Sequence, residues 1–90
     1  MIRLSGQLIC TDEQQAATVR AYLPDHVLLT LAEPGCLKFE VHETVNPLIW
    51  QVDESFADQP AFDAHQARTR ASEWHKATAR IARAFQIEND

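Results

Sequence analysis

Apolar and polar residues alternate at the start of the chain. From Ile2 to Cys10 every second position is apolar or glycine, and the intervening positions up to Gln7 are polar. A period of two is typical of a β-strand with one face on a core. Gly6 interrupts the apolar row and predicts the close approach of a backbone or a ligand at that point.

The period then becomes helical. The segment 11–14 has the sequence of a capping box, with Thr11 as the N-cap and Gln14 bonding back to it. Pro24 predicts a kink or the start of a second helical segment, and Pro34-Gly35 predicts the end of the helix. The residues expected on the buried face recur at intervals of three and four: Ala16, Val19, Leu23, His26, Val27 and Thr30.

Two further alternating segments, 36–42 and 49–56, are separated by a turn of hairpin length at 44–48. We expect one face of strand 36–42 to carry Leu37, Phe39 and Val41. In strand 49–56 the corresponding face carries Trp50, Val52, Glu54 and Phe56.

The remaining chain predicts a helix, a second short helix and a last strand. Asp58 or Gln59 caps the first helix, with Pro60 in its first turn, where a missing N–H donor costs little. Another helical stretch runs from about Ser72 to Arg80. Alternation returns near the end and predicts a strand over 83–88.

The order strand, helix, strand, strand, helix, strand predicts an α+β fold. Two right-handed crossovers in one antiparallel sheet give a ferredoxin-like βαββαβ sandwich with the helices on one face, and we expect residues 1–90 to form a single domain. The first two strands then run parallel. Cys10 and Cys36 fall at opposite ends of the sheet, which excludes a disulfide between them.

The second face of this sheet is left without helices. It is mostly polar, but Ile9 and Ile49 give it an apolar centre. Two interpretations fit the residues equally: a solvated antiparallel face, or a second sheet packed on the first in a two-chain barrel. A 90-residue chain is a candidate for dimerisation because small domains bury a modest share, about 60–65%, of their unfolded surface.

Composition narrows the classes of function. The net charge is -5, and five of the eight Lys and Arg residues lie in 68–90, a distribution that favours a solvated helix or a partner contact over nucleic-acid binding. The histidines and cysteines lack metal-ligand spacing, so we expect no metal site. No stretch is long enough to span a membrane and no secretory signal opens the chain. These patterns predict a soluble, cytoplasmic protein.

Glu54 and His65 are the candidates for acid–base chemistry. Strand alternation points the Glu54 carboxylate towards the helices, where it needs a partner, and His65 lies on the inward face of the following helix. A carboxylate that orients an imidazole makes a base that works near neutral pH. The alternative is a structural pair between sheet and helix.

Several aromatic residues are candidates for the wall of a pocket for a small aromatic molecule, with plain core packing as the alternative for each. His26, on the inward face of the first helix, is a candidate for the same pocket or for the core. The aromatic candidates are Phe39, Trp50, Phe56, Phe62 and Trp74.

The chain resembles the antibiotic biosynthesis monooxygenase family of small dimeric α+β barrel proteins. The resemblance rests on Ala-Glu-Pro-Gly-Cys-Leu at 32–37 and the strand that follows it. It also rests on Glu54, on the aromatic Phe56 two residues later, and on Asp-Ala-His at 63–65.

The resemblance implies a homodimer with its two sheets face to face and a pocket between sheet and helices. It also implies oxygenation of a small aromatic or quinol-type substrate by O₂ without a cofactor. His65 would act as base or substrate anchor with Glu54, and Trp50 and Phe56 would line the pocket. Two alternatives stay open: a dimeric ligand-binding or stress-related protein without turnover, and haem binding or degradation. The family's haem-degrading members use an asparagine on the first strand, where this chain has Ser5 and Gln7.

Overall fold

The computed structural model describes residues 1–90, which form one four-stranded sheet and three helices. The strands lie in the order β2-β3-β1-β4, and every neighbouring pair is antiparallel. This topology confirms the predicted ferredoxin-like fold. The elements are β1 (Ile2–Ile9), α1 (Glu13–Leu31), β2 (Cys36–Glu43), β3 (Ile49–Phe56), α2 (Gln59–Arg70), α3 (Glu73–Thr78) and β4 (Ala82–Asn89).

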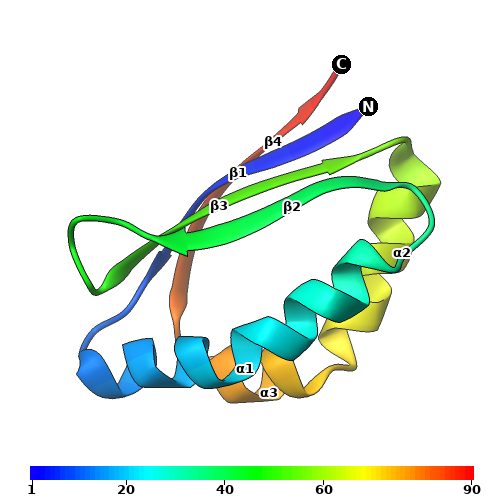
Figure 1. Cartoon of the computed structure of the whole chain (residues 1–90). Helices are drawn as coiled ribbons and strands as arrows, with labels where there is room; N and C mark the ends of the chain where they lie inside the picture. The colour runs from blue at the N-terminus through cyan, green and yellow to red at the C-terminus, as the bar shows by residue number, and fades with distance from the viewer.

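All three helices lie on one side of the sheet, and its other face is uncovered (Figure 1). The two termini lie side by side because β4 pairs with β1 along its whole length, from Ile2 opposite Asn89 to Ile9 opposite Ala82. The crossovers therefore place the core between sheet and helices, and any enclosed site must form in that layer.

The core follows the alternation of the strands. Every second residue of β3, from Trp50 to Phe56, is buried and faces the helices, as predicted. Glu54 is one of these residues and is only 8% exposed. The apolar core is completed chiefly by Ile2, Leu4 and Leu8 of β1, Ala16, Val19 and Leu23 of α1, Phe62 of α2, Trp74 of α3 and Ile81.

The start and course of α1 differ from the sequence prediction. Asp12, not Thr11, is the N-cap: its carboxylate accepts a hydrogen bond from the Gln15 backbone N–H at 2.9 Å, and the Gln15 side chain accepts one from the Thr11 backbone N–H at 2.8 Å. The capping box is thus one residue later than predicted, since Asp and Thr are both good N-caps. Pro24 does not begin a second helix, because buried residues on either side of it hold α1 together.

A bulge at the start of β2 changes which residues face the core. The register shifts between Cys36 and Lys38, so Leu37 has no partner on β3 and is 60% exposed, contrary to prediction. Phe39 resumes the alternation and is buried. Cys36 and Cys10 are both free and lie at opposite ends of β3, as predicted.

Gly35 positions the loop between α1 and β2 against α2. Its φ of +84° suits glycine, and a Cβ at this position would lie 2.6 Å from the Cβ of Ala61. The Gly35 carbonyl also accepts a hydrogen bond from Ala57 N–H at 2.8 Å. The tight contact brings Glu33, two residues earlier, next to α2.

Candidate functional site

A cavity of about 350 Å³ lies between the sheet and the helices. Its volume is at the lower end of the range for small-ligand sites, about 300–1,000 Å³. Five of the eight predicted site residues line it: His26, Phe39, Glu54, His65 and Trp74.

Three predicted residues lie outside its lining. Phe56 packs beneath His65 with ring centroids 4.8 Å apart, and Phe62 packs on Phe56 at 5.6 Å. Trp50 is buried in the core, and its indole N–H has no hydrogen-bond partner. Phe56 and Phe62 therefore pack below the His65 ring. Direct contact of Trp50, Phe56 or Phe62 with a ligand remains a prediction.

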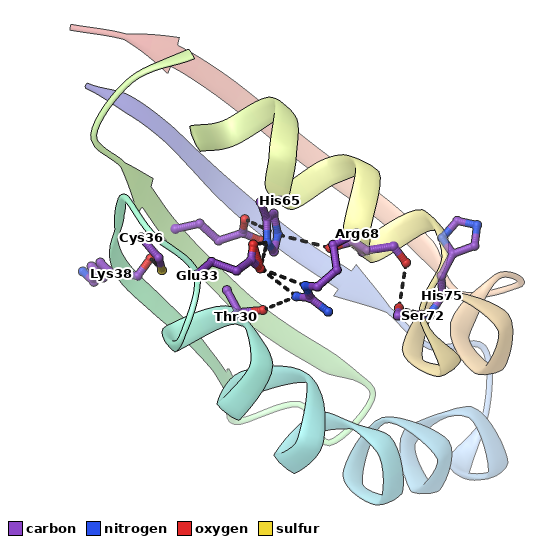
Figure 2. Close-up of polar contacts among 10 residues, drawn as sticks. Thr30, Glu33, Cys36, Lys38, His65, Arg68, Ser72 and His75 are labelled. Carbon is purple, nitrogen blue, oxygen red and sulfur yellow. Dashed lines mark hydrogen bonds and ion pairs between the residues drawn. The ribbon is translucent and has the colours of Figure 1, made fainter. Parts of the chain in front are cut away.

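One ring nitrogen of His65 forms a hydrogen bond with a carboxylate in the loop that follows α1. Its Nδ1 lies 2.8 Å and 3.2 Å from the two carboxylate oxygens of Glu33. Arg68, one turn further along α2, donates to Glu33 Oε1 from Nε at 3.0 Å and from a terminal nitrogen at 2.8 Å. Figure 2 shows Glu33 between His65 and Arg68, with Thr30 accepting a further hydrogen bond from Arg68 at 2.9 Å.

Glu54 approaches the other nitrogen of the same imidazole. Glu54 Oε1 lies 3.5 Å from His65 Nε2, and no other group bonds this oxygen. Burial, together with the smaller effect of the nearby negative charge of Glu33, raises the pKa of Glu54 to about 7. The strand and helix therefore bring together the two residues that the sequence singled out for acid–base chemistry.

The arrangement defines which nitrogen of His65 can exchange a proton. A carboxylate can only accept hydrogen bonds, so Nδ1 carries a hydrogen towards Glu33. Nε2 is then the basic nitrogen of the neutral ring and faces Glu54 and the cavity. Because the pKa of Glu54 is about 7, the carboxyl group beside Nε2 can be protonated or ionised near neutral pH.

A second buried histidine lines the same cavity without any polar partner. The His26 ring stacks on Trp74 at 4.8 Å with an interplanar angle of 4°, and meets the Phe39 ring edge-on at 5.3 Å. No protein group bonds its ring nitrogens, and Nδ1 is fully enclosed. Burial, followed by the charges of Arg68, His65 and Arg83, lowers the pKa of His26 to about 3. His26 is therefore a neutral imidazole at physiological pH.

Sequence reasoning missed the group that orients His65. In the sequence, Glu33 is simply part of the Pro34-Gly35 turn motif, and Arg68 is simply the first residue of a basic segment. One signal existed for Arg68, since residues three apart share a helix face. Glu33 is 32 residues away from His65, and only the Gly35 turn brings them together.

No cluster of three or more His, Cys, Asp or Glu side chains has the arrangement of a metal site. The polar groups that line the cavity are suited to proton exchange and to hydrogen bonding with an organic ligand. None of the three helices has the length and hydropathy of a membrane-spanning segment.

The fold and the cavity together define a small α+β protein with a buried carboxylate–imidazole–carboxylate arrangement facing a pocket. Residues 1–77 match the sequence profile of the antibiotic biosynthesis monooxygenase family. The chain belongs to this family, which confirms the resemblance found in the sequence.

Solved structures show the same fold over nearly the whole chain. A protein proposed to be an antibiotic biosynthesis monooxygenase, from Deinococcus radiodurans, superposes with a TM-score of 0.79 at 23% identity, covering 100% of this chain and 92% of that one. SnoaB, a cofactor-independent oxygenase from Streptomyces nogalater, gives 0.81 at 9% identity, covering 99% and 91%. At these identities the similarity shows the fold alone. No curated protein sequence matches this chain.

Proposed function

We propose that this protein is a cofactor-independent monooxygenase that oxidises a small aromatic, quinol-type substrate with O₂. The observation that carries the proposal is His65, held by Glu33 on one side and facing Glu54 and the cavity on the other. Family membership supports a monooxygenase, and SnoaB shows that an oxygenase of this fold can work without a cofactor.

The chemistry requires that the substrate itself supply the electrons. For a hydroquinone, the overall reaction is C₆H₆O₂ + O₂ giving C₆H₄O₃ + H₂O. One oxygen atom forms a bond to a ring carbon, the other leaves as water, and the substrate gives up four electrons. The ring hydroxyl must first lose its proton, because the anion transfers an electron to O₂ far more readily than the neutral phenol does.

His65 and Glu54 are suited to this proton transfer. His65 Nε2 takes the hydroxyl proton, and the resulting imidazolium is stabilised by the Glu33 carboxylate at 2.8 Å on Nδ1. Glu54 lies 3.5 Å from Nε2, so it can accept this proton and return it to the departing water. Arg68 positions Glu33 and does not line the cavity.

The cavity walls favour a flat, apolar ring. Phe39, Trp74 and the neutral His26 ring present aromatic surfaces around the space. The inner part of the cavity is buried at His26, Glu54 and His65, and low exposure to solvent there strengthens electrostatic interactions with an anion formed beside them.

Oxygen uptake tests the proposal directly. With hydroquinone in chelator-treated buffer, we expect protein-dependent O₂ consumption above the rate of autoxidation, with one O₂ consumed per hydroxyquinone formed. His65→Gln should lose about 100-fold or more of this rate, the usual size of a general-base contribution. The matched control is His42→Gln, which alters an exposed histidine of β2 and should keep the wild-type rate.

Equal uptake with and without protein, across hydroquinones and related polyphenols, would overturn the enzymatic proposal. An aromatic ligand that binds saturably and is recovered unchanged would instead indicate a ligand-binding protein. A shift of the Soret band on adding hemin would indicate haem binding.

We also propose that the protein is a homodimer whose two uncovered sheet faces pack together as a barrel. Ile9 and Ile49 support this assembly, because they lie directly opposite each other in the register of β1 and β3 on the face that lacks helices. Sedimentation should give about twice the chain mass of 10.2 kDa. Ile49→Lys should shift it towards the monomer, and a wild-type monomer at micromolar concentration would contradict the barrel.

A cytoplasmic location is part of the same proposal. Both cysteines are free and lie at opposite ends of β3, so the fold has no use for an oxidising compartment. Fractionation of cells that express the tagged protein would check this location.

A further inference from the structure

The positive charges of the molecule are unevenly neutralised. Five of its Lys and Arg residues form ion pairs with carboxylates: Arg3, Arg20, Lys38, Arg68 and Lys76. Of the three that do not, Arg70 and Arg83 line the cavity, whereas Arg80 does not. Both residues are exposed where they line the cavity, so their guanidinium groups are accessible to a ligand that enters it.

The two arginines lie at the end of the cavity away from Glu54. In the sheet, Glu54 is opposite Leu4 of β1, and Arg83 is opposite Leu8. The four intervening steps along β1 correspond to roughly 13 Å. Arg70 follows His65 by five residues on α2, which is about 7.5 Å along the helix axis.

Arg83 is held in place by backbone and hydroxyl acceptors. One terminal nitrogen donates to the carbonyls of Thr78 and Ile81, both at 2.9 Å, and the other donates to Thr78 Oγ1 at 2.7 Å. These acceptors position the guanidinium but leave its charge without a counter-ion. Arg70 makes no hydrogen bond or ion pair with the protein, so its donors are free for a ligand.

The middle of the cavity is aromatic and contains an unused polar group. His26 is only 4% exposed, lines the cavity and has no hydrogen-bond partner on either ring nitrogen. It stacks on Trp74, and its ring centroid lies 6.1 Å from that of His65. A buried, unpaired imidazole in such a place is a hydrogen-bonding group for a ligand.

We propose that the cavity selects an aromatic hydroxy acid: its hydroxyl lies at His65, its ring lies against Trp74 and Phe39, and its carboxylate faces Arg70 and Arg83. The placement of the hydroxyl rests on the proposed function, whereas the recognition of the carboxylate rests on the two unpaired arginines alone. A carboxylate at the basic end would also supply the counter-ion that the protein lacks there.

Binding of a matched ligand pair tests this selection. 6-Hydroxy-2-naphthoate carries its hydroxyl and carboxylate at opposite ends of a flat ring system, and its methyl ester replaces the negative charge with a methyl group. By isothermal titration calorimetry at pH 7.5, we expect the acid to bind at least tenfold tighter than the ester. Arg83→Gln and Arg70→Gln should each reduce this preference several-fold, and Arg80→Gln should leave it unchanged.

Arg83→Gln loses the hydrogen bonds to Thr78 and could unfold for that reason, so Arg83→Lys is a second test at this position. The lysine retains the charge and should preserve most of the preference, while Arg70→Gln removes a side chain that bonds nothing in the protein. Equal affinities for acid and ester, or a preference unaffected by either arginine variant, would overturn the inference.

Oxygen uptake with the same pair separates this inference from the proposed function. Preferential binding of the acid without O₂ consumption by any hydroxylated aromatic would support the ligand class and overturn the monooxygenase. Turnover of neutral quinols together with no preference for the acid would support the monooxygenase and overturn the ligand class.

Discussion

His26 and His65 are two buried histidines of one cavity, with ring centroids only 6.1 Å apart, and their surroundings are opposite. His65 has a carboxylate near each ring nitrogen, Glu33 and Glu54. His26 has aromatic rings on its faces and only positive groups among the charges that affect it. Residue type and burial therefore do not decide what a histidine does.

The two histidines differ in the charged groups that a proton on the ring would meet. A proton on His65 would lie beside two acidic partners, Glu33 at Nδ1 and Glu54 at Nε2. A proton on His26 would be added to a buried site already surrounded by positive charge, so this ring remains neutral. In the proposed function, His65 therefore transfers the proton and His26 offers a hydrogen bond to the ligand.

Removing the negative charge of Glu33, next to His65 Nδ1, should give the largest effect, a loss of kcat. Glu33→Gln keeps the shape of the side chain but loses the anion that stabilises the imidazolium and determines which nitrogen carries the hydrogen. We expect kcat for hydroquinone oxidation to fall about 100- to 1,000-fold with KM nearly unchanged, because the interaction strengthens only as the proton moves. The measurement is steady-state oxygen uptake.

The control for this variant is Glu40→Gln on β2, an exposed glutamate whose only ion pair is with Lys38 at 3.8 Å. It should retain wild-type kcat. If Glu33→Gln also retained it, His65 would not depend on Glu33 and would be no different from His26 in function.

Glu54 gives the next effect, on stability. Its pKa is about 7 in the folded protein against an ordinary value of 4.5, so between these pH values the folded state binds more protons than the unfolded state. Stability must then fall as pH rises through this window, by about 3 kcal/mol in all. Glu54→Gln cannot ionise and removes this loss.

Urea unfolding at pH 4 and pH 8 measures the effect. Relative to Glu54→Gln, the free energy of unfolding of wild type should decrease by about 3 kcal/mol from pH 4 to pH 8. Asp53→Asn, on the uncovered face next to Glu54, should show no comparable change. A constant difference between wild type and Glu54→Gln would mean that Glu54 ionises normally.

The sequence could predict the elements that carry the two histidines. Alternation in β3 placed Glu54 inward among apolar neighbours, and helical spacing placed His65 and His26 on buried faces. These are local patterns with a period set by backbone geometry, so they survive without knowledge of the fold. The pairing of Glu54 with His65 followed from the strand–helix connection between them.

The sequence could not predict the contacts that distinguish the histidines. The Glu33 contact depends on a loop packed tightly on α2, and the exposure of Leu37 depends on a one-residue bulge. His26 is kept neutral first by its burial and then by positive groups of α2 and β4, which only the assembled fold places beside α1. Such contacts depend on tertiary packing, which local spacing does not encode.

His26 itself gives the smallest effect, with the opposite sign to Glu54. Its pKa is about 3 when folded against an ordinary 6.5, so the unfolded state binds more protons between these values and stability falls as the solution is acidified. This contribution is fully present above pH 6.5 and amounts to a loss of about 2 kcal/mol between pH 7.5 and pH 5. His26→Phe keeps an aromatic ring against Trp74 and removes the loss. Urea unfolding of wild type and variant at the two pH values should show the difference between their free energies of unfolding changing by about that amount, in favour of the variant at pH 5.

The pH dependences caused by His26 and Glu54 oppose each other between pH 4.5 and 6.5, so the stability of wild type should change little in this range. His26→Phe should lose stability as the pH rises, and Glu54→Gln should gain it. Parallel curves for the three proteins would show that the two histidine environments do not differ in the way their contacts require.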